Sequence, residues 1–453
     1  MHQLVANQRT YFNTHATKSI EFRLQQLKRL KKALQSNEEL LYDAIYADFK
    51  KSRFETYMSE LALVYHDIDE ARKNLHKWSR KRRVKTNLLN FPATSYIIPE
   101  PLGVCLVIGA WNYPYQLSLA PMVAAMAAGC TVVLKPSELP ARTSVAMAKI
   151  ISENFSPEYI AVVEGGIPET TELLRLNFDK IFFTGSTTVG KIVYRAAAEK
   201  LTPVTLELGG KSPAFILKDC NLKMTVKRLI WAKFLNAGQT CIAPDYVIVD
   251  RSIEEKFMAL CKVEIEKERF SFSNGNYTQI INDRNLGRLQ ELIDPAKVYY
   301  GGKVNREQRY IEPTILKNVS FDDAVMQEEI FGPILPIIPY DILEEVIDQV
   351  LELPNPLSCY VFTRNGKLKK EILNKISFGG GMVNDAVTHI SNSNLPFGGV
   401  GSSGIGSYHG EAGFKAFTHY KSIVEKSTLL ELPLKYHPHS KAKLWWIRQF
   451  FKF

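Results

Sequence analysis

Short apolar runs recur every twenty to thirty residues between positions 103 and 208, and segments of helical character separate them. The runs occupy residues 104–108, 131–134, 159–163, 180–183 and 204–208. Nearly continuous apolar strands that alternate with helices are typical of a parallel sheet covered by helices on both faces. Because such sheets bind ligands at the carboxyl ends of their strands, the pattern predicts an α/β fold and the edge where its site lies.

The rest of the chain divides into a helical beginning and a second alternating region. Four leucines recur at helical spacing near the start: Leu24, Leu27, Leu30 and Leu34. A further helical stretch covers residues 55–78, and from 212 to about 419 the alternating pattern returns. The first segments of that second region are strands at 213–217 and 246–249 and a helix at 222–235. Because 453 residues exceed one ordinary core, we expect two or three domains.

Composition restricts the environment more than the function. Hydrophobic residues make up 45% of the chain and charged residues 23%, which is typical of a globular protein, and the net charge of +10 attracts anions without selecting among them. The six cysteines contain no C-x-x-C pair: Cys105, Cys130, Cys220, Cys241, Cys261 and Cys359. Without that pair, and without a secretory signal in residues 1–14, we expect a reducing, cytoplasmic location and no bound metal.

Three segments raise the question of membrane or nucleic-acid binding. The most apolar stretch, 117–134, contains Pro121 and Gly129, which favours a buried helix followed by a strand over a membrane span. The basic cluster 80–83 lacks the interleaved aromatic residues of a nucleic-acid platform, so we interpret it as a solvated helix end and expect no nucleic-acid partner.

The tail after Pro433 is the third such segment, and it mixes basic and aromatic residues. Its basic members are Lys435, Lys441, Lys443, Arg448 and Lys452, and its apolar members are Leu444, Trp445, Trp446, Ile447, Phe450, Phe451 and Phe453. Two compatible interpretations remain open. The tail is an amphipathic helix at a membrane surface, or it packs over the protein's own substrate entrance.

Three residues that are far apart in the sequence could together perform nucleophilic catalysis. Cys241 ends the loop GQTC after a helix, Glu207 ends a buried strand against two glycines, and Asn112 follows the strand at 104–108. Thiol catalysis requires a reachable thiolate, a donor for a developing oxyanion and a base for the second half-reaction. Each residue alone is a weak signal, because a cysteine is usually an inert core residue.

Two further loops could hold a nucleotide. Residues 184–190 (TGSTTVG) connect a strand to a helix, and backbone amides at such a helix start can bind a pyrophosphate. Lys135 and Glu138 follow another parallel strand and could bind the hydroxyls of a ribose. The first segment is not the G-x-G-x-x-G fingerprint or a Walker loop, so a capped helix and a surface charge pair are the alternatives.

Taken together, these segments resemble the aldehyde dehydrogenase superfamily, and most closely its class 3 branch. The similar strings are PEPLGV at 99–104, WNYP at 111–114, KPSE at 135–138, FTGSTTVG at 183–190, LELGGK at 206–211, GQTC at 238–241, EEIFGP at 328–333 and LPFGGVGSSGIGSYHG at 395–410. They occur in the family's order over nearly the whole chain.

The resemblance implies a role for each matched residue. Cys241 is then the nucleophile, Glu207 the base that activates the hydrolytic water, and Asn112 the oxyanion donor alongside the Cys241 amide. The residues that would hold NAD, or NADP as a second option, are Lys135 and Glu138 at the adenosine ribose, Gly185, Ser186 and Gly190 at the pyrophosphate turn, and Glu329 and Phe331 at the nicotinamide ribose and ring. We also expect Tyr113, Tyr115, Trp231 and Phe397 to line an apolar tunnel for a long-chain or aromatic aldehyde.

The resemblance also implies a domain plan and a homodimer. A Rossmann-like nucleotide-binding domain would comprise residues 1–85 and 102–208, and a catalytic domain residues 209–420. A bridging β element at 86–101 and 421–430 would pair subunits, and 431–453 would form the tail. Two alternatives to hydrolytic aldehyde oxidation stay open: a dehydrogenase that transfers its acyl group to coenzyme A, and a non-catalytic membrane-associated protein on the same scaffold.

Overall fold

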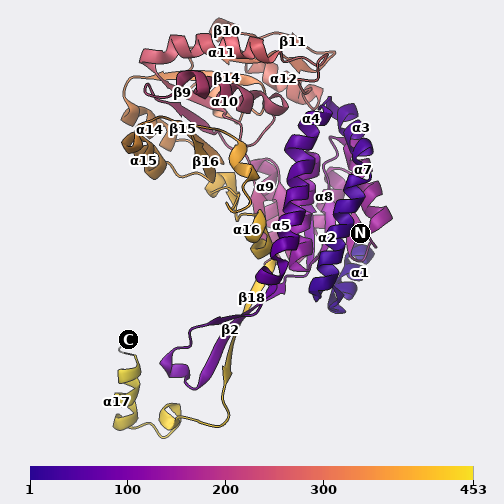
Figure 1. The fold of residues 1–453 in the computed structure, drawn as a ribbon, viewed down its shortest axis with the longest axis vertical. Coiled ribbons are helices and arrows are strands. Elements are labelled where there is room, and N and C mark those ends of the chain that lie inside the picture. The colour runs from indigo at the N-terminus through magenta and orange to yellow at the C-terminus, as the bar shows by residue number, and fades with distance from the viewer. Residues whose placement is uncertain (452–453) are drawn as a thin grey trace.

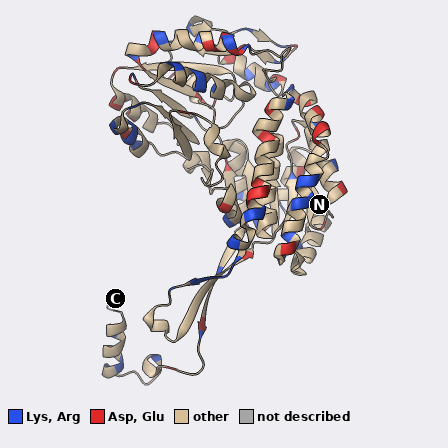
Figure 2. Cartoon of the chain, viewed as in Figure 1, with Lys and Arg blue, Asp and Glu red and all other residues tan. Residues whose placement is uncertain are grey.

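The computed structural model describes residues 1–451, and two parallel sheets with their covering helices form its two main bodies (Figure 1). A long, thin arm extends from one of these bodies and carries the end of the chain. Along the outer helices, Lys and Arg alternate with Asp and Glu (Figure 2). The two parallel sheets with their covering helices confirm the expected α/β class.

The first sheet has the order β17-β7-β6-β3-β4-β5, and the five strands from β7 to β5 are parallel. Its strands are β3 (Val104–Ile108), β4 (Thr131–Lys135), β5 (Ile160–Val162), β6 (Lys180–Thr184), β7 (Val204–Glu207) and the antiparallel β17 (Gly404–Ile405). β3, β4 and β6 are buried along their whole length, which explains why their sequences are continuous apolar runs.

Helices of the first 200 residues surround this sheet. They are α1 (His2–Asn13), α2 (Ile20–Gln35), α3 (Glu38–Phe49), α4 (Arg53–Thr56), α5 (Ala62–Ser79), α6 (Pro114–Ala128), α7 (Ala141–Asn154), α8 (Ile167–Leu174) and α9 (Thr187–Ala198), with the 3-10 turn η1 (Ala16–Lys18). A π-helical turn, η2 (Tyr57–Leu61), separates α4 from α5 within the stretch predicted as one helix. The apolar stretch at 117–134 is buried α6 followed by β4, as expected.

The second sheet has the order β10-β13-β14-β9-β8-β15-β16 and is parallel from β13 to β16. Its strands are β8 (Pro213–Ile216), β9 (Tyr246–Asp250), β10 (Val298–Tyr300), β13 (Thr314–Leu316), β14 (Ile334–Tyr340), β15 (Ser358–Phe362) and β16 (Gly380–Val383). The short pair β11 (Val304–Asn305) and β12 (Tyr310–Ile311) lies apart from it in a separate sheet.

The helices of this second region complete the two bodies. They are α10 (Leu222–Phe234), α11 (Glu254–Glu268), α12 (Asp283–Glu291), α13 (Ala324–Gln327), α14 (Leu343–Leu351), α15 (Gly366–Lys375) and α16 (Gly410–Ala416). The 3-10 turns are η4 (Leu235–Gly238), η5 (Arg251–Ile253), η6 (Pro295–Lys297), η7 (Thr388–Ser391) and η8 (Gly401–Ser403). α16 packs against α5 and α6 of the first body, so the chain returns there before it enters the arm.

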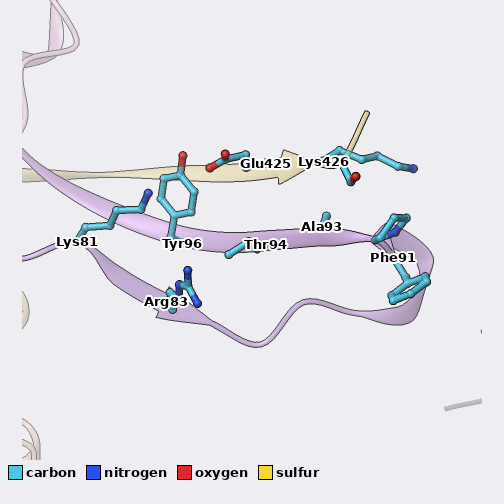
Figure 3. A pocket seen from close by; sticks show the side chains of 10 residues that line it. Lys81, Arg83, Phe91, Ala93, Thr94, Tyr96, Glu425 and Lys426 are labelled. Carbon is cyan, nitrogen blue, oxygen red and sulfur yellow. The ribbon is translucent and has the colours of Figure 1, made fainter. Parts of the chain in front are cut away.

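The arm is a three-stranded antiparallel sheet in the order β1-β2-β18. It consists of β1 (Arg82–Val84), η3 (Leu88–Asn90), β2 (Ala93–Pro101) and β18 (Thr418–Lys426), and it leads to η9 (Pro433–Lys435) and α17 (Lys441–Phe450). A hollow of about 460 Å³ opens on the arm, lined among others by Lys81, Tyr96 and Glu425 (Figure 3). None of the expected catalytic residues lines this hollow.

Three expectations about the organisation differ from the structure. Residues 404–405, expected in the catalytic domain, form β17 and pair with β7 of the first sheet. Residues 82–84, expected in the first domain, form β1 of the arm, so the basic cluster begins at Arg80, the C-cap of α5, and continues into an exposed strand. α17 lies beyond the arm, away from both bodies, which contradicts a tail packed over its own chain's entrance (Figure 1).

Within residues 1–451, no helix has the length and apolar character needed to cross a membrane.

Candidate active site

The loop that carries Cys241 begins where α10 ends. Asn236, Ala237 and Gly238 follow one another in the left-handed region, with φ of 54°, 53° and 73°. A Cβ on Gly238 would lie 2.3 Å from the carbonyl oxygen of Gly332, so only glycine fits at this position. Two successive non-glycine residues in this region are costly, and they persist only where the surrounding structure holds them.

Hydrogen bonds from several elements hold this loop. The Asn236 amide donates to Oε1 of Glu55 at 2.8 Å. Nε2 of Gln239 donates to the carbonyl oxygens of Asn236 and Gln279, at 3.1 and 3.0 Å, and its Oε1 accepts from the Ile281 amide at 3.0 Å. Because these bonds use the side chain of the residue two before Cys241, the backbone next to the thiol is fixed before any substrate arrives.

Asn112 lies beside this loop, as the sequence predicts. Its side chain is buried, and Nδ2 donates to the carbonyl oxygen of Gln239 at 3.0 Å. The next residue, Tyr113, makes a second link, because its hydroxyl lies 2.6 Å from Oγ1 of Thr240. The turn after β3 and the loop after α10 therefore meet at Cys241, although 127 positions separate the bonded residues.

Glu207 ends β7 as a buried carboxyl without a protein partner. It is only 3% exposed, and neither side-chain oxygen accepts a hydrogen bond from any described residue. Burial raises the pKa of Glu207 well above its usual value. A buried carboxyl without a partner is costly to fold, so its occurrence at this strand end points to a functional role.

The Cys241 thiol lies within the electrostatic reach of two carboxyls. Burial raises the pKa of Cys241 above its ordinary range, and the charges of Glu329 and Glu207 raise it further. The backbone amides of Cys241 and Ile242 act in the opposite direction because they donate toward the sulfur. The structure thus brings the predicted thiol, carboxyl and amide together from three distant segments, and it adds Glu329 as a fourth group.

The segment after α13 supplies Glu329 and Phe331. Burial and the neighbouring Asp245 raise the pKa of Glu329 to about 8, against the opposing effect of Lys211. A Cβ on Gly209 would lie 1.8 Å from Oε2 of Glu329, so the glycine makes room for this carboxyl. Phe331 has φ of 51°, and its ring meets the edge of Trp111 at a centroid distance of 5.3 Å.

Lys135 and Glu138 lie at the carboxyl end of β4. Lys135 is buried, which lowers the pKa of its ammonium, while the carboxylates of Glu138, Glu169 and Glu164 oppose that effect. Its Nζ donates to the carbonyl oxygen of Pro136 at 2.8 Å, its one hydrogen bond to the described residues. An ammonium has three N–H groups, so two remain for the hydroxyls of a ribose. These residues fit a dinucleotide.

Gly185, Ser186 and Gly190 surround the start of α9. Ser186 caps the helix, with Oγ accepting from the Val189 amide at 3.4 Å, and it is exposed. The start of α9 follows β6 directly, where a pyrophosphate would meet free amides. A Cβ on Gly190 would lie 2.6 Å from Leu208, so this glycine allows the helix to pack closely on the sheet, which explains it without a ligand.

The four tunnel candidates have different surroundings. Tyr113 contacts Thr240 directly, and Phe397 is buried with its ring 5.8 Å from that of Tyr408, a residue whose pKa is raised by burial and by Glu207. Trp231 is partly buried on α10. Tyr115 does not fit a tunnel wall: it is fully buried, and its hydroxyl donates to the Leu41 carbonyl at 2.7 Å, which makes it a core residue.

Several residues near the site were missed by the sequence reasoning. Thr240 contacts Tyr113, and the fully buried pair Lys51 and Glu60 lies beneath Asn112. A charged residue looks like a surface position in a sequence, so Lys51 and Glu60 gave no signal. Thr240 adjoins the proposed nucleophile and could have been included on that ground.

Comparison with known proteins shows which family this chain resembles. The model of the aldehyde dehydrogenase family matches residues 1–423. A 4,4'-diaponeurosporen-aldehyde dehydrogenase of Staphylococcus aureus is 45% identical over 98% of this chain and 97% of its own. Aldehyde dehydrogenase family 3 member A2 of Pongo abelii is 44% identical over 97% and 91%, and the dimeric NADP-preferring aldehyde dehydrogenase of Rattus norvegicus is 44% identical over 97% and 98%.

A solved structure is similar to this chain over almost its whole length. The substrate-bound state of the Staphylococcus aureus enzyme AldH has a TM-score of 0.97 and 44% identity, with 99% of each chain covered. The chain therefore belongs to the aldehyde dehydrogenase family. It is an NAD(P)-dependent oxidoreductase of that family, and the expected similarity to the class 3 branch is confirmed.

Proposed function

We propose that this enzyme oxidises a long-chain or aromatic aldehyde to the acid through a thioester on Cys241 that water hydrolyses. The observation that carries the proposal is the meeting of Asn112 with the Cys241 loop, through the 3.0 Å bond to Gln239, near the buried carboxyl of Glu207. The names of the relatives, one of which acts on 4,4'-diaponeurosporen-aldehyde, support a large apolar substrate.

In the first half-reaction, the partly exposed Cys241 thiol releases its proton to solvent water, and the thiolate adds to the carbonyl carbon. A negative charge then develops on the oxygen. Asn112 Nδ2 and the Cys241 amide donate to that oxygen, and donors that are fixed in advance lower the barrier most. Collapse of the adduct expels hydride from the same carbon and leaves a thioester. The oxidised nicotinamide, when bound, supplies the hydride acceptor.

In the second half-reaction, Glu207 removes a proton from water as the water oxygen attacks the thioester carbon. The carbon–sulfur bond then breaks, the acid leaves and the thiolate is regenerated. The base must be ionised for this step, and its raised pKa gives it the basicity to deprotonate water. Lys135 and Glu138 would bind one ribose and Glu329 the other, while Phe331 would lie along the nicotinamide.

Mutant kinetics with hexanal and NAD test these roles. Cys241→Ala should abolish NADH formation while NADH still binds, as followed by its fluorescence. Glu207→Gln should give a burst of about one NADH per site and then a slow steady state, because only deacylation is impaired. A Glu207→Gln enzyme that turns over at the normal rate without a burst would remove Glu207 from the role of base.

Product analysis separates the hydrolytic reaction from the two alternatives. Free hexanoic acid formed without coenzyme A supports hydrolysis, while strict dependence on coenzyme A would mean acyl transfer to that thiol. Glu207 argues against acyl transfer, because that reaction does not require a water-activating base. Folded enzyme that produces no NADH from any of a panel of aldehydes would support the non-catalytic alternative.

A homodimer and a membrane contact complete the proposal. The arm exposes apolar side chains such as Leu88, Phe91 and Val424, which suits pairing with a second copy, and one relative is named as dimeric. α17 exposes Leu444, Trp445 and Trp446 together with Lys441, a combination that suits an anionic membrane surface. Light scattering of Val424→Glu tests the dimer, and co-sedimentation of Trp445→Ala/Trp446→Ala with anionic vesicles tests the contact.

A further inference from the structure

Lys51 and Glu60 form an ion pair with no solvent access beneath the turn that holds Asn112. Their charged atoms are 2.7 Å apart, and both side chains are 0% exposed. Two backbone irregularities direct them inward. Lys50, the C-cap of α3, has φ of 58°. Glu60 lies in the π-helical turn η2, where the Ala62 amide donates to the Tyr57 carbonyl.

Glu60 fixes the start of α6. Its Oε2 accepts hydrogen bonds from the amides of Tyr115 and Gln116, at 2.7 and 3.4 Å. The N-cap residue of α6, Tyr113, provides no side-chain cap of its own. The carboxylate of another segment therefore satisfies the amides at this helix start, which the helix dipole also favours.

Lys51 fixes the two residues just before α6. Its Nζ donates to the carbonyl oxygen of Asn112 at 3.1 Å and lies 4.1 Å from the ring centroid of Tyr113. Nδ2 of Asn236, in the Cys241 loop, donates to the same carbonyl oxygen at 2.9 Å. The ammonium thus contacts both residues whose side chains reach the Cys241 loop.

We propose that Lys51 and Glu60 are positioning residues for the oxyanion donor. The pair holds the turn from below, so that the side chains of Asn112 and Tyr113 meet Gln239 and Thr240 next to the thiol. This inference rests on the role of Asn112 in the proposed function. Stability alone gives little reason for the pair, because apolar residues of similar volume usually stabilise a core at least as well as a buried ion pair.

The main test is the neutral double variant Lys51→Met/Glu60→Gln. The Glu60→Gln change keeps a side-chain oxygen that can accept from the Tyr115 amide, so α6 keeps its cap, while Lys51→Met removes the donor to Asn112. Two rates are measured well below the melting temperature: the NADH burst with hexanal, and acylation by 4-nitrophenyl acetate, an ester that a thiolate attacks without cofactor. We expect both rates to fall about tenfold, because small displacements of a catalytic group are costly.

Controls separate positioning from a general loss of structure. Lys297→Met/Asp323→Asn removes a partly buried ion pair that touches neither Asn112 nor the Cys241 loop, and it should leave both rates unchanged. Lys51→Arg keeps a donor for Asn112 and should retain more of both rates than Lys51→Met. If Lys51→Arg is as slow as Lys51→Met at equal fold content, the hydrogen bond to Asn112 is not what matters and the proposal fails.

A double-mutant cycle decides the question. In an Asn112→Ala background, Lys51→Met/Glu60→Gln should cost clearly less of both rates than in the wild type, since the amide donor is gone and only the contact of Tyr113 with Thr240 is left to position. An equal loss in both backgrounds would mean a structural role and would overturn the inference. If Asn112→Ala alone leaves both rates unchanged, the proposed oxyanion role of Asn112 is wrong. If Asn112→Ala slows both rates but Lys51→Met/Glu60→Gln does not, the oxyanion role stands and only the positioning role of the pair is wrong.

Discussion

The hydroxyl of Tyr113 and Oγ1 of Thr240 lie 2.6 Å apart, and this contact joins the turn after β3 to the residue immediately before Cys241. Both side chains are buried, so water does not compete for the bond. The contact makes Tyr113 part of the support of the thiol as well as a candidate wall of the aldehyde tunnel.

Replacing Tyr113 with Phe should slow acylation of Cys241 about threefold to tenfold, the range expected for one neutral hydrogen bond. Stopped-flow measurement of the NADH burst checks this. Tyr115→Phe is the matched control, since its hydroxyl bonds to Leu41 in the core. It should lower the melting temperature and leave the burst rate unchanged. An equal loss of burst rate in both variants would show that the Tyr113 hydroxyl has no special role beside the thiol.

Glu207→Gln should stabilise the protein above pH 5. The pKa of Glu207 is raised in the folded state, so above the usual glutamate pKa the unfolded chain releases its proton while the folded chain retains it. This difference disfavours folding by roughly 1.4 kcal/mol for each pH unit until the raised pKa is reached. The neutral amide removes the penalty.

Urea unfolding at pH 4.5 and pH 7.5 measures the effect of Glu207→Gln. The gain in unfolding free energy should be small at the lower pH and larger at the higher pH. A gain that is equal at both values would show that the carboxyl has a normal pKa in the folded enzyme.

Glu138→Gln should shift cofactor preference toward NADP. The carboxylate lies near Lys135, where the adenosine ribose would bind, and it would repel a 2′-phosphate. Removing a repulsion of about 1 kcal/mol raises the ratio of kcat/KM for NADP to that for NAD roughly fivefold. Glu172→Gln, an exposed carboxylate on α8, is the control and should leave the ratio unchanged. An unchanged ratio of kcat/KM for NADP to that for NAD in the Glu138→Gln enzyme would show that this carboxylate does not lie at the ribose site.

Gly209→Ala should raise the KM for NAD about tenfold. A Cβ at this position would lie 1.8 Å from Oε2 of Glu329, so the carboxyl must move from where it would hold a ribose. Losing one hydrogen bond to the ribose accounts for an effect of that size. Initial rates over a range of NAD concentrations check the prediction, and Glu329→Gln should have no further effect in the Gly209→Ala enzyme. If the effects of Gly209→Ala and Glu329→Gln on the KM for NAD are fully additive, the Gly209→Ala change does not act by displacing the Glu329 carboxyl.

Much of the fold could be predicted because local patterns carry it. The run 104–108 is β3, and the helix expected at 222–235 is α10 within one residue. β17 could not be predicted, because its two residues pair with β7, about two hundred positions earlier, and their own pattern is not that of a strand. The π-helical turn at Tyr57–Leu61 was missed for a similar reason, since helical periodicity continues on both sides of it.

In the candidate site, too, residues in local sequence patterns could be predicted, whereas those that depend on tertiary packing could not. Cys241, Glu207 and Asn112 could be predicted as one candidate site because each stands in a short distinctive string at the end of a strand or helix. Tyr115 was misplaced, because an aromatic residue beside a catalytic string has the same sequence pattern whether it faces a tunnel or the core. Lys51 and Glu60 were missed, because only tertiary structure shows that a charged residue is buried.

The left-handed run Asn236–Gly238 also determines which changes of chain length the enzyme tolerates. These residues join the end of α10 to Cys241 in one fixed backbone conformation. Each residue of a helix turns the chain by about 100°. A single insertion or deletion in α10 would therefore rotate the sulfur away from Asn112, whereas loops at the far ends of the strands can vary in length. Homologues and engineered libraries should show length variation in those loops and none between Leu222 and Cys241.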